Sequence, residues 1–362
     1  MFRILIAATL CLLAATPLWA LETSAGRMRV EEVAKGFRMP WSFAFLPDGG
    51  MLVTEKRGRL LLVRDGKAVS VKGVPEVDTS GQGGLLDVMV PRDFAGTREI
   101  FLTHAKPQTG GNGTALTRAV LSVDGSELTG VRTIFEMKPG NSGGHHFGSR
   151  VVEAPDGHLF MTMGERGVRE AAQDLSRHNG TVIRLNRDGS VPSDNPFVGV
   201  DGALPEIWSY GHRNPQGAAM DASGQFWVNE HGAKGGDEVN RVKKGANYGW
   251  PVISYGRHYS GGKIGVGTEK AGMEQPVFYW DPSIAPSGMT FYDGSVAGWN
   301  GSAFVGSLKF DYIARLAGDP MGEVEQIKAP ETKRVRDVRT GPDGALWFLS
   351  EDRGAVYKLV KE

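Results

Sequence analysis

One turn-and-strand motif occurs four times along the chain and restricts the folds available to it. Each copy has Asp and Gly in a tight turn followed by a short apolar strand, and the copies begin at Asp48, Asp156, Asp221 and Asp343. These positions are 108, 65 and 122 residues apart, so two intervals are close to twice a unit of about 55 to 60 residues. Repeats of that length, made of short strands, are typical of β-propeller blades.

Six such units account for the chain after its first 20 residues, and we therefore predict an all-β, six-bladed β-propeller with four-stranded blades. The blades without the motif are expected at about 98–135 and 288–328. Glycine supplies 51 of the 362 residues, which disfavours helices because each interior glycine costs a helix about 1 kcal/mol. A large β-sandwich or a pair of sandwiches is the alternative. In a propeller, loops from several blades meet at the central channel, so site residues are expected to be scattered through the sequence.

The first 20 residues have the pattern of a secretory signal peptide. Arg3 is their only charged residue, an apolar run covers 4–15, and cleavage is predicted after Ala20. The alternative is an uncleaved anchor, but the apolar run is shorter than the roughly 20 residues that a membrane span needs. The predicted domains are thus a signal peptide at 1–20 and a single propeller domain at 21–362, with no membrane span in the mature chain.

Charge and cysteine content exclude several classes of protein. The 41 basic residues balance the 41 acidic residues, which excludes the basic surface typical of a nucleic-acid-binding protein. Cys11 is the only cysteine and lies in the predicted signal peptide, so the mature chain has no disulfide and no thiolate site. The letters of a nucleophile elbow occur at 140–144, but they lie among glycines with no predicted helix after them.

Two polar segments contain candidate catalytic groups. His146 follows Gly143, Gly144 and His145, and a neutral imidazole can accept a proton near neutral pH, so His146 is a candidate general base. If this segment enters a strand, residues 146, 148 and 150 share one face. Arg213 and the Asn that follows it can bind an anion or a carbonyl group. The alternatives are a surface histidine and a loop whose arginine caps main-chain carbonyls.

Two further segments carry clustered charge. Arg334 and Arg336 are expected on one face of a strand, where two guanidiniums repel each other unless an anion lies between them, and Lys309 is a similar cation. The acidic, glycine-rich stretch at 230–240 fits a hard cation held by carboxylate and carbonyl oxygens. The alternatives are a solvated strand edge and an acidic loop that caps turns. Together, several cations, one base and one hard-metal site predict a flat polyanionic cofactor with a metal.

In the order and spacing of these motifs, the chain resembles the soluble, pyrroloquinoline quinone (PQQ)-dependent aldose sugar dehydrogenases, which are six-bladed propellers exported to the bacterial periplasm. The matching motifs run from residue 39 to the C-terminus and surround Gln82, His146, Arg213, Lys309 and Arg334. The resemblance implies that an aldose is oxidised at its anomeric carbon to a lactone and that electrons pass to an external acceptor. It implies PQQ and Ca²⁺ as cofactors and a periplasmic monomer or homodimer.

The resemblance also assigns roles to individual residues. His146 is expected to take the proton of the anomeric hydroxyl, and Arg213 to stabilise charge on the quinone oxygens. The residues that resemble cofactor contacts are Gln82, Arg213, Asn214, Tyr259, Lys309, Asp311, Arg334 and Arg336. The residues that resemble calcium ligands are Gly232 and Ala233, through their carbonyls, and Glu238 with the Tyr248 carbonyl in a second site.

Two positions depart from the family pattern. The glucose-oxidising members have Asp where this chain has His145, and an Asp that pairs with the base where this chain has Glu165. The preferred sugar and the partner that orients the base therefore remain open.

Two other functions remain as alternatives. One is a calcium-dependent propeller sugar lactonase, which has no use for the cations at Lys309, Arg334 and Arg336. The other is a non-catalytic propeller that binds sugar or protein, which predicts loss of the base or of the cofactor cations.

Overall fold

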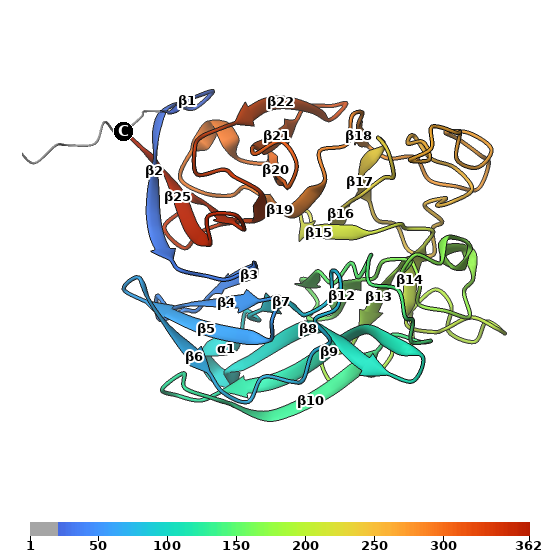
Figure 1. The fold of residues 1–362 in the computed structure, drawn as a ribbon, viewed down its shortest axis with the longest axis horizontal. Coiled ribbons are helices and arrows are strands. Elements are labelled where there is room, and N and C mark those ends of the chain that lie inside the picture. Colours follow the sequence, from blue (N-terminus) through green and yellow to red (C-terminus); the bar gives the residue numbers. More distant parts are fainter. Residues whose placement is uncertain (1–20) are drawn as a thin grey trace, which may run out of the picture.

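The computed structural model describes residues 21–362 and contains six antiparallel sheets arranged in a ring around a central axis (Figure 1). The innermost strand of each sheet contacts the innermost strands of its two neighbours, so the ring is continuous. Helix in the described residues is confined to α1 (Phe94–Thr97) and to short 3₁₀ turns at Arg169–Gln173 and Ala297–Trp299. The predicted six-bladed β-propeller is thereby confirmed, whereas the signal peptide predicted for 1–20 lies outside the described residues.

Five blades have four strands each, ordered from the channel outward. The first two blades contain β3 (Pro40–Phe45), β4 (Met51–Glu55), β5 (Arg59–Arg64) and β6 (Lys67–Val71), then β7 (Leu85–Met89), β8 (Glu99–Gln108), β9 (Gly111–Leu121) and β10 (Leu128–Glu136). The next two contain β11 (Val151–Glu153), β12 (Leu159–Thr162), β13 (Thr181–Leu185) and β14 (Ile207–Tyr210), then β15 (Pro215–Met220), β16 (Phe226–Glu230), β17 (Asp237–Arg241) and β18 (Phe278–Trp280). The fifth contains β19 (Pro286–Phe291), β20 (Ala303–Ser307), β21 (Ile313–Ala317) and β22 (Gly322–Ile327).

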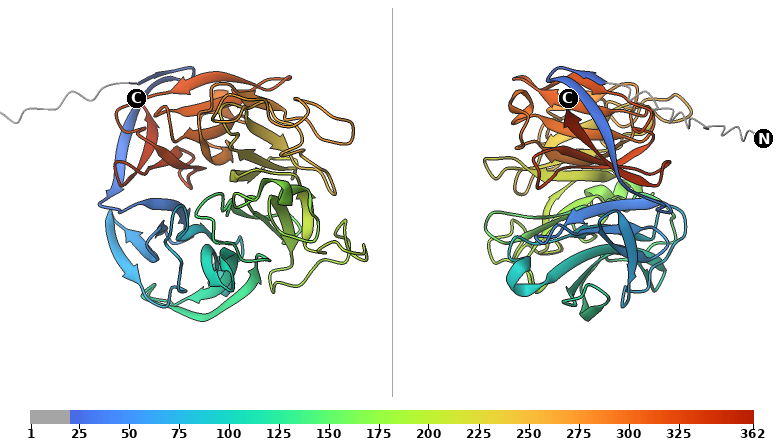
Figure 2. Two further views of the ribbon diagram at one scale, coloured as in Figure 1. Left: turned by 45° about the vertical axis from the view of Figure 1, so that its right-hand side comes forward. Right: turned by 90° about the vertical axis from the view of Figure 1, so that its left-hand side faces the viewer.

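The sixth blade closes the ring with strands from both ends of the described chain. It contains β23 (Val335–Thr340), β24 (Leu346–Ser350) and β25 (Ala355–Lys361), followed outward by β2 (Gly26–Lys35) and the short β1 (Leu21–Thr23). Figures 1 and 2 show the blue β2 beside the red C-terminal strands. This blade has five strands rather than the predicted four, because β1 folds back on β2.

The repeated motif occupies the same place in four blades. In each copy, the Asp lies in the turn after the innermost strand and the apolar residues form the second strand. Each motif Asp accepts a hydrogen bond from the main-chain N–H two residues later, at 2.8–3.1 Å. The motif is therefore a side-chain-stabilised turn that sets the first antiparallel pair of a blade. The two blades without it are β7–β10 and β19–β22, which confirms the expectation for those regions.

Antiparallel pairing places two loops of every blade at the same end of the propeller. The innermost strand begins opposite the end of the second strand, as in the pairs Pro40–Glu55, Pro215–Glu230 and Val335–Ser350. The segments before the first strand and after the second strand therefore meet at one mouth of the channel. Residues far apart in the sequence are brought together there.

A buried ionic network joins the innermost strands of four blades across the channel. Asp87 accepts hydrogen bonds from Ser42 Oγ at 2.6 Å and from Arg150 Nη1 at 3.0 Å. Asp337 pairs with Arg150 at 3.2 Å and with Arg339 at 3.1 Å. A buried charge without its partner is strongly destabilising. The inner strands must therefore stay at the distances that keep these ion pairs intact.

We predict that Asp87→Asn lowers the free energy of unfolding by about 3–5 kcal/mol, because the buried guanidinium of Arg150 and the partly buried one of Arg339 would then share one carboxylate, that of Asp337. Urea denaturation measures the change. The control is Asp201→Asn at an exposed position, which should stay within about 0.5 kcal/mol of the wild type. Equal denaturation midpoints for the two variants would contradict the role given to the network.

Candidate functional site

Several predicted site residues lie on loops at this one mouth of the channel, whereas Arg336 lies within β23 and Glu238 within β17. His146 precedes β11, Arg213 precedes β15 and Arg334 precedes β23, each just before an innermost strand. Glu165 and Glu351 follow second strands, so they reach the same mouth from the other side of each pair. These residues come from the third, fourth and sixth blades, so the site is scattered in sequence, as the propeller geometry predicted.

His146 and Glu165 form a hydrogen-bonded pair. Nδ1 of His146 lies 2.8 Å from Oε2 of Glu165, and the same carboxylate oxygen accepts the N–H of Gly167. The Glu165 side chain is only 1% exposed, so this hydrogen bond is shielded from solvent. A carboxylate has no proton to donate, so Nδ1 carries the hydrogen and Nε2 has a free lone pair.

The environment keeps this imidazole neutral at neutral pH. Burial lowers the pKa of His146, and the hydrogen bond to Glu165 opposes that effect only in part. Burial raises the pKa of Glu165, but the hydrogen bond from His146, the N–H of Gly167 and the neighbouring positive charge of Arg213 together outweigh it, so the pKa lies below its usual value. A neutral imidazole held by a carboxylate is the arrangement of a general base.

The backbone of the His146 segment differs from the strand that we considered. β11 begins only at Val151, and φ is +59° at His146, +61° at Gly148 and +91° at Ser149. Such left-handed conformations interrupt strand alternation, so positions 146, 148 and 150 do not share a strand face. Arg150 instead enters the channel network described above.

Arg166 holds this irregular loop in place. It is 1% exposed, its guanidinium stacks 3.5 Å from the Phe147 ring centroid, and its N–H groups donate to the carbonyls of His145 and Gly143 at 2.5 and 2.6 Å. Gln82 contributes from the neighbouring blade, since its Oε1 accepts the N–H of His146 at 2.9 Å. The position of the base therefore depends on two blades.

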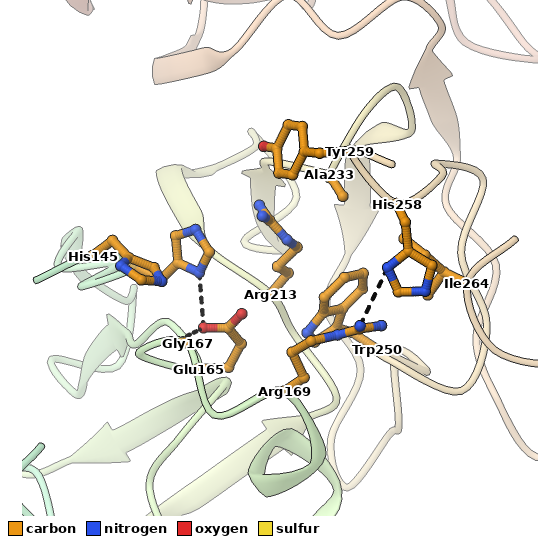
Figure 3. A pocket seen from close by; sticks show the side chains of 11 residues that line it. His145, Glu165, Gly167, Arg169, Arg213, Ala233, Trp250, His258, Tyr259 and Ile264 are labelled. Carbon is orange, nitrogen blue, oxygen red and sulfur yellow. Dashed lines mark hydrogen bonds and ion pairs between the residues drawn. The ribbon is translucent and has the colours of Figure 1, made fainter. Parts of the chain in front are cut away.

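His146 and Glu165 line a cavity of about 170 Å³ at the channel mouth. Three other residues predicted for the site, Arg213, Ala233 and Tyr259, line it too. The rest of the lining comes from His145, Gly167, Arg169, Trp250, His258 and Ile264. Figure 3 shows Arg213 between His145 on one side and Trp250 with His258 on the other. Tyr259 is 73% exposed and lies at the opening rather than inside.

Arg213 and Asn214 have unused hydrogen-bonding capacity beside this cavity. Nη1 of Arg213 donates to the His231 carbonyl at 3.2 Å, but its buried Nε has no partner among residues 21–362. Oδ1 of Asn214 accepts the N–H of Gly148 at 3.1 Å, whereas the buried Nδ2 is unpaired within the described chain. Buried donors without partners are costly, which indicates a ligand with acceptor atoms here.

A second group of cations lies on the fifth and sixth blades. Arg334 and Arg336 both pair with Glu351, at 3.3 and 2.5 Å, so the anion expected between the two guanidiniums is a carboxylate of the chain itself. The main-chain N–H of Arg334 donates to Asp311 at 2.9 Å. Nζ of Lys309 lies 4.8 Å from the Phe310 ring centroid. The three cations, Lys309, Arg334 and Arg336, outnumber the two carboxylates, Glu351 and Asp311, which leaves this group net positive.

His231 connects the two groups of cations. Burial lowers its pKa to about 3, and the nearby positive charges of Arg213 and Arg336 act in the same direction. Its Nε2 lies 2.7 Å from the Pro286 carbonyl, so the neutral ring donates there. Arg336 also donates to Gln216 at 2.8 Å. His231 therefore lies between Arg213 at the cavity and Arg336 on the sixth blade, and the two sets of cations are close to each other.

The four residues predicted as calcium ligands lie next to the main cavity. Gly232, Glu238 and Tyr248 line a small neighbouring cavity, and Ala233 lines the main one. Burial raises the pKa of Glu238 to about 8, and the Glu230 carboxylate adds to the shift. Residues 21–362 contain no group of three or more His, Asp or Glu side chains arranged for a metal, so a cation here would depend on main-chain carbonyls.

Sequence reasoning missed the functions of Arg166, Arg169 and Glu351. One signal for Glu351 was present, because all four copies of the repeated motif end in Glu, at Glu55, Glu165, Glu230 and Glu351. Antiparallel pairing brings every one of them to the site mouth. No comparable periodic signal exists for the two arginines, which lie on the connection between β12 and β13.

The fold is a six-bladed propeller that brings a histidine–carboxylate pair and several arginines to one mouth, and comparisons with known proteins show its family. A sequence model of the Glucose / Sorbosone dehydrogenase family matches residues 37–358. Aldose sugar dehydrogenase YliI of Escherichia coli is 45% identical over 353 residues, covering 94% of this chain and 94% of that protein.

Solved structures show the same likeness. The soluble aldose sugar dehydrogenase of Escherichia coli in its apo-form has a TM-score of 0.90 and 44% identity, covering 92% of this chain and 100% of that chain. The PQQ-bound aldose sugar dehydrogenase of Streptomyces coelicolor has a TM-score of 0.76 and 27% identity, covering 92% and 98%. The chain belongs to the glucose/sorbosone dehydrogenase family, which confirms the predicted family and the predicted enzyme class, a sugar dehydrogenase.

We predict that Glu165→Gln moves the titration of His146 to lower pH. The Glu165 carboxylate raises the His146 pKa against the effect of burial, so its removal lets burial act alone. NMR titration of the histidine ring measures the shift, with Glu170→Gln at an exposed neighbouring position as control. A His146 titration at the same or a higher pH in Glu165→Gln would show that the pair does not control the base.

Proposed function

We propose that the protein is a PQQ-dependent dehydrogenase that oxidises the anomeric carbon of an aldose to a lactone and passes the electrons to an external acceptor. The observation that carries this proposal is His146, whose Nδ1 is bonded to Glu165 and whose Nε2 is free, in the cavity that it shares with Arg213. The PQQ-bound structure of a relative supports the choice of cofactor.

The residues of the mouth fit PQQ, which has three carboxylates and an ortho-quinone. The unpaired donors of Arg213 and Asn214 would hold its oxygens, and the net positive group of Lys309, Arg334 and Arg336 would hold its carboxylates. Gln82, Tyr259 and Asp311 are proposed to complete the contacts. When bound, the cofactor supplies the acceptor for the hydride of the sugar.

The chain itself supplies the proton transfer. We infer that Nε2 of His146 takes the proton of the anomeric hydroxyl while the ring keeps its Nδ1–H on Glu165. The Glu165 carboxylate then stabilises the imidazolium that forms, and the Arg213 guanidinium stabilises negative charge that develops in the cavity.

We propose calcium at two places on the fourth blade. The carbonyls of Gly232 and Ala233 would hold one ion beside the cofactor, and Glu238 with the Tyr248 carbonyl would hold a second. Glu230 and Glu238 are two buried carboxylates bridged by Asn240, at 3.0 and 3.1 Å, and a cation would relieve their repulsion.

We further propose export to the periplasm with removal of residues 1–20, as a monomer or a homodimer. In the described residues, every helix is too short or too polar to cross a membrane. The lactonase alternative gives no purpose to the arginine group of the fifth and sixth blades, and a binding-only propeller gives none to the paired base.

Reconstitution tests the proposal directly. We predict that the purified mature chain reduces an artificial dye only when PQQ, Ca²⁺ and an aldose are all present. Dye reduction without PQQ, or no PQQ binding at all, would contradict the proposed function and favour the lactonase or binding alternatives.

We predict that His146→Gln binds PQQ like the wild type but loses roughly 10²–10⁴-fold in turnover, the usual contribution of a general base. PQQ absorbance titration checks binding, and dye reduction checks the rate. His158→Gln is the matched control, because His158 lies in the motif turn of the third blade, 2.8 Å from Asp156, and is outside the cavity lining. Near-normal turnover in His146→Gln would assign the base elsewhere.

A further inference from the structure

The wall of the cavity opposite His145 carries a cation that the proposed mechanism does not use. Figure 3 shows Arg169, Trp250 and His258 together on that side. Arg169 begins the 3₁₀ turn after Glu165, and His258 lies on the long connection between β17 and β18. Both line the cavity with His146, so a sugar whose anomeric carbon meets the base has its far end near this wall.

Arg169 is held in place, yet its charge is not balanced by the chain. Its guanidinium carbon lies 5.0 Å from the Trp250 ring centroid, and Nη1 lies 3.4 Å from Nδ1 of His258. Its buried Nε has no partner among residues 21–362. Arg334 and Arg336 differ, because both pair with Glu351, whereas Arg213 shares with Arg169 a buried Nε that has no partner among residues 21–362 and is already proposed to hold the cofactor.

No other group in the cavity lining offsets this charge. Glu165 is the only carboxylate among the lining residues, and it is already bonded to His146 and to the N–H of Gly167. His258 and His145 add imidazole groups that can donate hydrogen bonds. Apart from Nε2 of His146, which is proposed to take the anomeric proton, the part of the cavity that faces the substrate is therefore rich in donors and cations.

This wall is separate from the residues proposed for the cofactor carboxylates. Those lie on the fifth and sixth blades, whereas Arg169 and His258 belong to the third and fourth. The indole of Trp250 lies near both Arg169 and Arg213, at 5.0 and 5.2 Å from their guanidinium carbons. Stacking on the indole orients the Arg169 guanidinium and leaves its N–H groups available for a ligand.

We propose that the preferred substrate is an aldose with an acidic group, a carboxylate as in a hexuronic acid or a phosphate ester, and that Arg169 binds this group while His146 faces the anomeric carbon. The proposal rests on the proposed dehydrogenase function. An anionic oxygen pair satisfies the Arg169 donors, and a neutral hexose does not.

The test compares kcat/KM of the PQQ- and calcium-loaded enzyme for D-glucose, D-glucuronate and D-glucose 6-phosphate at low ionic strength. One of the acidic sugars should exceed glucose by at least tenfold, the effect of one charge-assisted pair, and the better of the two identifies carboxylate or phosphate. Arg169→Gln should abolish this ratio. Arg177→Gln, a surface arginine 3.3 Å from Asp174, is the control that should keep it.

A binding measurement separates this proposal from the proposed function. Methyl glucuronide and methyl glucoside cannot be oxidised at the blocked anomeric carbon, so calorimetry on the loaded protein reports recognition alone. Tighter binding of the glucuronide that disappears in Arg169→Gln supports the proposal if the preferred anion is a carboxylate, and methyl glucoside 6-phosphate tests the phosphate in the same way. Equal binding of acidic and neutral glycosides, or an unchanged ratio in Arg169→Gln, overturns it. Absence of any aldose oxidation refutes only the dehydrogenase.

Discussion

The antiparallel pairing of the two innermost strands in each blade is the constraint on which the site depends. Because each first strand begins where the second ends, every blade sends two loops to the same mouth of the channel. The third blade supplies His146, the proposed base, the fourth supplies Arg213, and the fifth and sixth supply the cluster of cations. The arrangement holds only while the ring is closed, and it is closed by the pairing of β2 with β25 and by the network around Asp87.

The carboxylates that end the second strands have a common task, which is to fix a basic group. Glu165 holds His146, Glu230 holds His212 at 2.8 Å, and Glu351 holds the two arginines of the sixth blade. What each of the two histidines can do depends on Nε2, the ring nitrogen that does not contact the carboxylate. In His212 it lies 2.9 Å from Ser209 Oγ, which leaves nothing for a substrate, whereas in His146 it is free. The same local device thus gives a structural histidine in one blade and a base in the next.

The sequence predicted the features that repeat and missed those that do not. Asp48, Asp156, Asp221 and Asp343 mark turns at a fixed place in the blade, so the blade number and the scattered site followed from their spacing. The resemblance located His146 and the cofactor arginines, and the structure brings them to one mouth. The left-handed backbone at His146, the clamp by Arg166 and the unbalanced Arg169 depend on loop contacts between blades, which no pattern along the chain encodes.

The central claim is that cations from the fifth and sixth blades hold the cofactor in front of a base from the third. Calorimetric titration of the calcium-loaded protein with PQQ tests it most directly, using the wild type, Arg334→Ala and the surface variant Arg27→Ala, whose side chain is 64% exposed. The account predicts one PQQ per chain in the wild type, an affinity at least tenfold weaker in Arg334→Ala, and no change in Arg27→Ala. Equal affinity in all three proteins would contradict it.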